Sequence, residues 1–197
     1  MTELVKMEDH KDFLQTLIDS KKLPGHVKSV EDAFTIAQMG KELGFAAMQS
    51  FHYIIPIQGK LSLSAKGIGA LLRKGGVEFV TTEDGVYVYS DGTTSEYPKE
   101  GDDKPVDRRT TIVFYRNDKE ETCSFTWKEA TGMGLTTKDN WKKMPKFMLW
   151  ARCLSKGANR VGADFLLGLY CTEELFDHME GVQAVRTEEG EIIEIKD

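Results

Sequence analysis

Apolar residues recur at every third or fourth position in three stretches of the first half of the chain, which is the spacing of an amphipathic helix. The first stretch covers residues 7–20. The second follows Ser29, a residue type that caps helix N-termini, and ends at Gly44. The third begins after Ser64 and ends at Gly75. We therefore expect three helices in this half of the chain.

Alternating apolar and polar residues predict antiparallel strands between and after these helices. Strands are expected at residues 53–57, 61–64, 77–82, 86–90, 110–116 and 121–126. The first two strands are joined by Gln-Gly-Lys, the next two by Glu-Asp-Gly, and the last two by a turn at Asn117-Asp118. Short turns of this kind connect the strands of hairpins. Residues 91–107 are rich in Gly, Pro and charged residues, which favours a loop.

A long helix is predicted nearer the end of the chain, because Pro145 suits the first turn of a helix and apolar periodicity continues to about Val161. Residues 141–144 either extend this helix upstream with a kink at the proline, or lie outside it if the proline breaks the helix. Residues 164–177 are also expected to be helical. The order of elements indicates an α+β fold in which an antiparallel sheet of hairpins packs against helices.

The composition is that of a globular protein of one domain, with 197 residues of which 40% are hydrophobic and 29% charged. No apolar run approaches the roughly 18 to 20 residues of a membrane span, so we expect no membrane partner. The first residues lack the pattern of a secretory signal, and the three cysteines have no CxxC spacing. We therefore expect a cytoplasmic protein with free thiols and no structural zinc site.

The charge is distributed unevenly along the chain. The net charge is -6, but residues 138–160 carry seven basic residues and one acidic residue, so the rest of the chain sums to -12. Nine acidic and two basic residues follow Tyr170. The segment 138–160 therefore predicts a concentrated positive surface of the kind that binds polyanions. Residues 181–197 are expected to form an acidic, mobile C-terminal tail.

The basic side chains of the predicted long helix fall on one face at 100° per residue, and its apolar side chains fall on the other. This face comprises Lys142, Lys146, Arg152, Lys156 and Arg160. Like charges four residues apart repel one another, and no acidic residue of the helix relieves them in register, so a phosphate backbone is the expected partner. Trp141, beside Lys142 and Lys143, is expected either to stack on a base or to lie in the core.

A second group of basic residues comes from the first predicted hairpin and the helix that follows it. It consists of Lys60, Lys66, Arg73 and Lys74. These residues either form a second wall of the same groove or are solvated cations at a turn and at a helix C-terminus, where positive charge is favoured. Arg108 and Arg109, at the start of a predicted strand, are a further candidate contact.

The sequence lacks recognisable catalytic motifs. Gly59-Lys60 is not followed by Ser or Thr as a phosphate-binding loop requires, and residues 132–134 lack the third glycine of a dinucleotide site. The four histidines do not have the spacing of metal ligands. Acidic residues at 100–103 are able to bind magnesium, but acids in a loop of this composition usually face solvent. We expect no enzymatic activity and no cofactor.

Three long stretches of the sequence carry a resemblance to a known protein family. They read LPGHVKSVEDAFTIAQMGKELGF from Leu23, MQSFHYIIPIQGKLSLSAKGIGALLRKGG from Met48, and NWKKMPKFMLWARCLSKGANRVGADFLLGLYCTEEL from Asn140. The second contains a hairpin with a Gly-Lys turn that leads into a helix, and the third contains Trp-Lys-Lys, a basic helix and a Gly-x-Tyr-x-x-Glu-Glu ending. Together these stretches cover about half of the chain, and they resemble the RecT-type phage single-strand DNA annealing proteins.

This resemblance implies a fold related to the single-strand annealing recombinases, with residues 1–180 as a DNA-annealing core. It implies ATP-independent binding of single-stranded DNA, annealing through a duplex intermediate, and self-assembly into rings or helical filaments inside a bacterial host cell. A phage exonuclease and the host single-strand binding protein are candidate partners. By position, DNA contacts are expected near Lys60 and Lys66 and from Lys142 to Arg160. Many members carry a longer C-terminal region, which a short acidic tail replaces here.

Two other functions are consistent with the sequence. One is a metal-dependent nuclease that uses the acids of residues 100–103. The other is a phage adaptor or non-annealing DNA-binding protein whose basic face binds DNA or an acidic protein.

Overall fold

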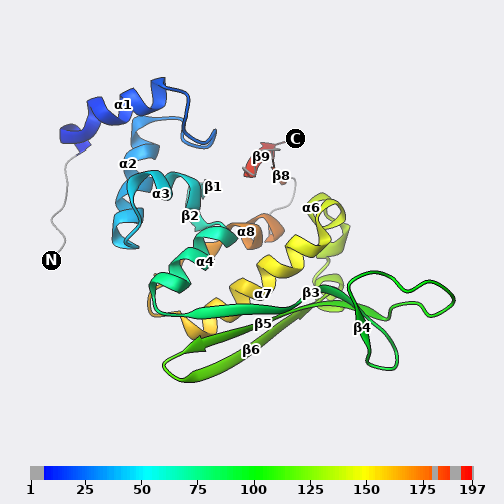
Figure 1. Ribbon diagram of the computed structural model, residues 1–197. Helices are drawn as coiled ribbons and strands as arrows, with labels where there is room; N and C mark the ends of the chain where they lie inside the picture. The colour runs from blue at the N-terminus through cyan, green and yellow to red at the C-terminus, as the bar shows by residue number, and fades with distance from the viewer. Residues whose placement is uncertain (1–6, 179–181, 187–191, 197) are drawn as a thin grey trace.

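The computed structural model describes residues 7–178, 182–186 and 192–196 of the chain. A four-stranded antiparallel sheet forms one layer, and the long helix α7 (Pro145–Val161) lies across one face of it (Figure 1). The N-terminal helices and a smaller sheet lie on the same side of the large sheet as α7 (Figure 1). The predicted α+β class, with antiparallel strands packed against helices, is confirmed.

Three helices form the N-terminal part of the described chain. They are α1 (Lys11–Asp19), preceded by a single 3-10 turn η1 (Met7–His10), α2 (Val30–Glu42) and α3 (Ala47–Tyr53). The predicted cap at Ser29 is confirmed, because its hydroxyl accepts a hydrogen bond from the N–H of Asp32 at 3.1 Å. Gly44 has a φ of 73°, the left-handed conformation that ends many helices. The sequence did not predict α3, because seven residues are too few to show a helical period.

The smaller sheet confirms the first predicted hairpin. Strand β1 (Ile54–Ile57) pairs antiparallel with β2 (Lys60–Leu63), and β2 pairs in parallel with β7 (Tyr170–Cys171). Ser64 caps the following helix α4 (Ala65–Lys74) by accepting a hydrogen bond from the N–H of Gly67 at 3.2 Å. The prediction of a helix over 164–177 is wrong for its first part, because β7 occupies residues 170–171 and only α8 (Thr172–His178) is helical.

The larger sheet has the strand order β4-β3-β5-β6. Its strands are β3 (Glu78–Val88), β4 (Thr94–Ser95), β5 (Asp107–Arg116) and β6 (Lys119–Thr126). The predicted turn between β5 and β6 is confirmed, since Asn117 and Asp118 have φ angles of 51° and 60° as a tight hairpin turn requires. The predicted loop over 91–107 contains the short strand β4, which pairs with the end of β3.

The predicted hairpin over residues 77–90 is wrong. The structure forms the single strand β3 there, which pairs with β5 on both sides of the Glu-Asp-Gly stretch. The register shifts between Thr81 and Glu83 and again between Glu83 and Val86, so the extra residues form a bulge rather than a turn. Glu83 fixes this bulge to β5, because Arg109 donates hydrogen bonds to both of its carboxylate oxygens, at 2.8 and 2.6 Å. Local composition indicated a turn, and pairing with β5 overrides it.

The main core lies between the large sheet and α7. Ile112 and Phe114 of β5 point toward the helix and are fully buried, as are Leu149 and Leu154 of α7. Gly157 allows the helix to approach the sheet closely, because a Cβ atom at this position would overlap the ring of Phe114.

The remaining elements follow β6. They are α5 (Trp127–Gly132), the 3-10 turn η2 (Leu135–Thr137), α6 (Asp139–Lys143), and strands β8 (Val182–Arg186) and β9 (Ile192–Lys196). β8 and β9 pair antiparallel within the segment 181–197, for which the sequence predicted only an acidic tail. Five of the 17 residues of this segment are acidic, and each of its strands has only five residues, too few to show a clear alternation.

Candidate nucleic-acid interface

The predicted basic helix is two helices, because the chain breaks at Met144 between α6 and α7. Met144 has φ and ψ angles of -133° and 55°, which are not helical. Pro145 therefore starts α7 and does not kink a longer helix. Lys142 and Lys143 project from α6 and Lys146 from the first turn of α7, and all three side chains are exposed. These three lysines are the part of the predicted basic face that stays exposed as a group, although the Lys143 ammonium lies 3.5 Å from the exposed carboxylate of Asp139.

Trp141 does not provide the base-stacking surface that was one of its two expected roles. Its side chain is 0% exposed, and its indole contacts the ring of Phe125 at 6.3 Å and that of Trp127 at 5.8 Å between centroids. The alternative expectation, that Trp141 lies in the core, is confirmed. Its burial fixes α6 against the end of the large sheet.

The expectation that Arg152 lies on an exposed cationic face is wrong. The residue is 7% exposed, and its guanidinium lies 3.1 Å from the carboxylate of Glu174. The reason is that α8 packs against α7 at this point and covers the side chain. A helical wheel shows which residues share a face, but it does not show which neighbouring element covers that face.

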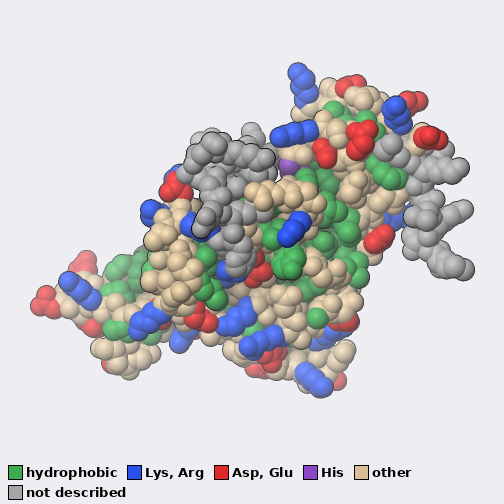
Figure 2. Space-filling model, turned by 180° about the vertical axis from the view of Figure 1, so that it is seen from behind, with side chains coloured by type: hydrophobic (Ala, Val, Ile, Leu, Met, Phe, Trp, Pro, Cys, Tyr) green, Lys and Arg blue, Asp and Glu red, His purple; other side chains and the backbone are tan. Residues whose placement is uncertain are grey.

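Lys156 and Arg160 face the large sheet's outer edge rather than an open groove. The Lys156 ammonium lies 3.0 Å from the carboxylate of Glu129, and the Arg160 guanidinium lies 2.7 Å from that of Glu121. The absence of acids in register along the helix is therefore compensated by acids from α5 and β6. On the face seen in Figure 2, Lys and Arg side chains are interspersed with Asp and Glu side chains rather than forming one continuous positive band.

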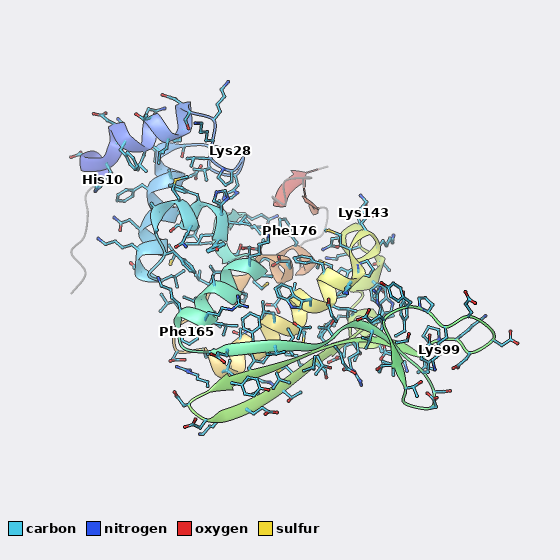
Figure 3. All side chains as sticks on the ribbon, in the orientation of Figure 1. His10, Lys28, Lys99, Lys143, Phe165 and Phe176 are labelled. Atoms are coloured by element: carbon cyan, nitrogen blue, oxygen red, sulfur yellow. The ribbon has the colours of Figure 1, made fainter. Side chains whose placement is uncertain are left out.

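The second predicted basic group is exposed, but part of it lies far from α6. The Arg73 guanidinium lies 4.5 Å from the ring centre of Phe79, and the Lys74 ammonium lies 5.5 Å from that of Phe45. This end of α4 contacts Phe165, which follows the C-terminus of α7. Phe165 and Lys143 lie at opposite ends of α7 (Figure 3), which with 17 residues is about 24 Å long.

Lys60 and Lys66 are also exposed, in the β1–β2 turn and the first turn of α4. Neither forms an ion pair among the residues that the structure describes. The structure thus places the two predicted basic groups on different elements, and Arg73 and Lys74 do not share one wall with Lys142 and Lys143.

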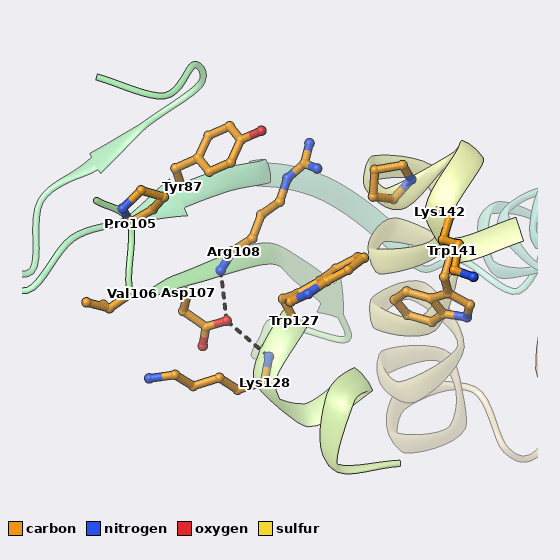
Figure 4. Close-up of a pocket in the computed structure, with 10 residues that line it drawn as sticks. Tyr87, Pro105, Val106, Asp107, Arg108, Trp127, Lys128, Trp141 and Lys142 are labelled. Atoms are coloured by element: carbon orange, nitrogen blue, oxygen red, sulfur yellow. Dashed lines mark hydrogen bonds between the residues drawn. The ribbon is translucent and has the colours of Figure 1, made fainter. Parts of the chain in front are cut away.

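A pocket of about 490 Å³ lies beside α6, at the end of the large sheet (Figure 4). We call it the aromatic pocket; it is lined by Tyr87, Pro105, Val106, Asp107, Arg108, Trp127, Lys128, Trp141, Lys142 and Pro145. Its residues come from β3, the loop before β5, β5 itself, and helices α5 to α7. The sequence indicated Arg108, Trp141 and Lys142 as contacts but not Tyr87, Trp127 and Lys128, because these residues are brought together only by the sheet pairing.

Hydrogen bonds fix the floor of the aromatic pocket. One carboxylate oxygen of Asp107 accepts from the backbone N–H groups of Arg108 and Lys128, at 2.8 and 3.1 Å. The Arg108 side chain donates to the carbonyl oxygen of Gly85 at 2.7 Å, and its guanidinium lies 4.9 Å from the ring centre of Tyr87. The bulge in β3 supplies this carbonyl, so the irregular strand helps to orient the arginine.

A second hollow, of about 520 Å³, adjoins the aromatic pocket and shares Pro145 with it. It is lined by Thr81, Asp84, Lys143, Met144, Pro145, Lys146, Phe147 and Trp150. The Lys146 ammonium lies 2.9 Å from the carboxylate of Asp84, and the indole N–H of Trp150 donates to the hydroxyl of Thr81 at 3.2 Å. We call the two hollows together the α6–α7 groove. Its cations are Arg108, Lys128, Lys142, Lys143 and Lys146.

Several titratable groups outside the groove are engaged in structure. Hydrogen bonds from Arg109 lower the pKa of Glu83. Burial raises the pKa of the Cys153 thiol to about 12 and raises those of Cys123 and Cys171 as well. In the described residues, no group of three or more His, Cys, Asp and Glu side chains is arranged to hold a metal ion.

Comparisons with known proteins add no family assignment. No protein-family model matches the chain, and neither a curated protein nor a solved structure matches it. Within the described ranges, every helix is too short or too polar to cross a membrane.

Proposed function

We propose that this protein binds single-stranded DNA in the α6–α7 groove and anneals complementary strands without ATP. The single observation that carries the proposal is the grouping of five cations around aromatic and apolar walls, at the end of the sheet where α6 meets α7. Lysine and arginine side chains bind phosphates, and aromatic surfaces bind unpaired bases, so a surface with both suits a single strand.

Annealing requires no chemical step from the protein. Two strands repel each other through their phosphates, and a cationic surface that holds one backbone lowers this repulsion for the second. Base pairing then supplies the specificity. The RecT-type resemblance supports this activity, together with assembly into a ring or helical filament and a role in phage-type recombination in a bacterial cytoplasm.

Lys60 and Lys66 are a second contact region in this proposal, because the resemblance includes the hairpin and helix that carry them. Lys156 and Arg160 contribute less than the sequence suggested, since Glu129 and Glu121 already pair with them. The same holds for Lys146 within the groove, which pairs with Asp84. A DNA phosphate that reached any of these cations would first have to displace its carboxylate.

Charge reversal in the groove tests the proposal. The double variant Lys142→Glu and Lys143→Glu should bind a fluorescent oligo(dT) at least tenfold more weakly than the wild type, measured by anisotropy. Annealing of two dye-labelled complementary strands should slow in parallel. The matched control is Lys21→Glu with Lys22→Glu, an adjacent exposed pair that follows α1. Equal losses in both double variants would show a nonspecific charge effect and contradict the assignment to this groove.

Labelled oligonucleotides also distinguish the two alternative functions from single-strand binding. Labelled single strands incubated with magnesium should stay intact, whereas a nuclease would shorten them. An adaptor that binds only an acidic protein would not shift the anisotropy of the oligonucleotide at any concentration used.

A further inference from the structure

We propose that the aromatic pocket receives one unstacked nucleobase of the bound strand. This assignment rests on the proposed function and specifies the ligand of one part of its site. The pocket volume of about 490 Å³ lies in the range of small-ligand sites, and most of its lining side chains are aromatic or apolar. A groove that contacted only phosphates would not need such a pocket.

Trp127 is the main surface for the base. It is partly exposed and lines the pocket, whereas its neighbour Trp141 is fully buried behind it. The two indoles meet at 62° with centroids 5.8 Å apart, which fixes the orientation of Trp127. Figure 4 shows the Trp127 side chain in the space between Arg108 and α6. A fixed indole binds a base with little loss of side-chain entropy.

Arg108 and Tyr87 form the second planar surface. The Arg108 guanidinium is held near the Tyr87 ring at 4.9 Å and donates to the carbonyl oxygen of Gly85 at 2.7 Å. A guanidinium oriented in this way is able to stack on a base while its remaining N–H groups face a phosphate. The pocket therefore has aromatic or planar groups from β3, β5 and α5.

The charges of the pocket favour a nucleotide over an apolar peptide. Lys128 and Lys142 are exposed beside Arg108, so three cations surround the space. The single acid of the lining, Asp107, already accepts two backbone hydrogen bonds. A proline-rich peptide would bury the aromatic walls but leave these cations without partners. A nucleotide provides a partner for the aromatic walls and for the cations, since its base contacts the rings and its phosphate contacts the cations.

The first test is substitution of the stacking surface. Trp127→Ala should weaken binding of oligo(dT) by about 5- to 150-fold, the loss usual for one base stacked on an aromatic side chain. Trp127→Phe should recover much of this loss. Tyr97→Ala removes an exposed aromatic residue that does not line the pocket and should bind as the wild type does.

A second variant covers the case in which Trp127→Ala fails to fold. Val106 lies at the pocket and is 46% exposed, so Val106→Glu places a carboxylate at the entrance without disturbing the core. It should weaken binding to a similar extent while its thermal transition stays near that of the wild type. Binding of Val106→Glu with wild-type affinity would overturn the pocket assignment.

Photo-crosslinking locates the base directly. An oligonucleotide that carries one 5-iodouracil, which crosslinks to aromatic rings on which it stacks, should form its adduct at Trp127 or Tyr87, identified by mass spectrometry. Adducts elsewhere, with normal binding by Trp127→Ala, would refute the pocket while leaving single-strand binding intact. A wild-type protein that binds no single-stranded DNA would refute the proposed function and the pocket together.

Discussion

At the scale of single residues, the fate of a charge depends on which element covers it. Arg152 and Arg160 are eight positions apart on α7, and a helical wheel places them near one another. Arg152 is covered by α8 and paired with Glu174, whereas Arg160 stays exposed beside Glu121. The first residue therefore stabilises the fold, and the second remains at the surface.

This difference predicts opposite results for two alanine variants. Arg152→Ala should lower the free energy of unfolding by about 3 kcal/mol or more, because it leaves the carboxylate of Glu174 without its buried partner. Arg160→Ala, the matched control, should unfold close to the wild type. Urea unfolding followed by circular dichroism measures both. Equal stability of the two variants would contradict the account of Arg152.

The buried thiols make stability depend on alkaline pH. Burial raises the pKa of Cys153 from 9.0 to about 12. Below pH 9 this thiol is neutral in both states, but between pH 9 and about 12 it ionises only in the unfolded chain, which favours unfolding. The free energy of unfolding should therefore fall between pH 8 and pH 10, and by less in Cys153→Ala. The free energy of unfolding of each protein is compared with its own value at pH 8. An equal fall in the wild type and in Cys153→Ala would argue against ionisation of Cys153 as the cause.

At the scale of elements, sequence patterns located the helices and hairpins that carry their own local signals. Ser29 and Ser64 mark two helix starts, Pro145 marks a third, and Asn117-Asp118 marks a turn, and all four are confirmed. The bulge in β3 and the short strand β7 depend on partners more than 20 residues away, so no local pattern contains them. The same limit explains why Tyr87 and Trp127 were missed as neighbours in the candidate site.

The contact of α7 with the sheet gives a test at this scale. Gly157→Ala should destabilise the protein by about 1 to 3 kcal/mol, because the added methyl group would overlap the Phe114 ring and force the helix from the sheet. Gly132→Ala, in α5, is the control, since a Cβ atom there meets nothing within 4 Å. Differential scanning calorimetry of the two variants should show a lower transition temperature for Gly157→Ala alone.

At the scale of the whole molecule, the acidic net charge conceals a local cationic groove. Residues 138–160 sum to +6 and the remainder of the chain to -12, although ion pairs across elements neutralise part of the basic segment. Five cations lie together where α6, α7 and the end of the sheet meet, namely Arg108, Lys128, Lys142, Lys143 and Lys146. The composition alone does not reveal this local grouping.

The proposed annealing activity predicts assembly on DNA. Copies that contact head to tail form rings or open helices rather than closed pairs, and DNA would neutralise the repulsion between their basic surfaces. Light scattering at fixed protein concentration should therefore show larger particles after two complementary strands are added in succession than for protein alone. A particle size that stays the same with single strands and with annealed strands would count against assembly.

We expect the cations of the α6–α7 groove to contact the phosphates of single-stranded DNA. The salt dependence of oligo(dT) affinity measures these contacts. Four phosphate contacts, at Arg108, Lys128, Lys142 and Lys143, at about 0.7 ion each predict that the logarithm of the association constant falls against the logarithm of salt concentration with a slope near -2.8. In the Lys142→Glu and Lys143→Glu double variant, the slope should become shallower by at least about 1.4. A flat salt response of the wild type, or the same slope in the variant, would contradict the claim.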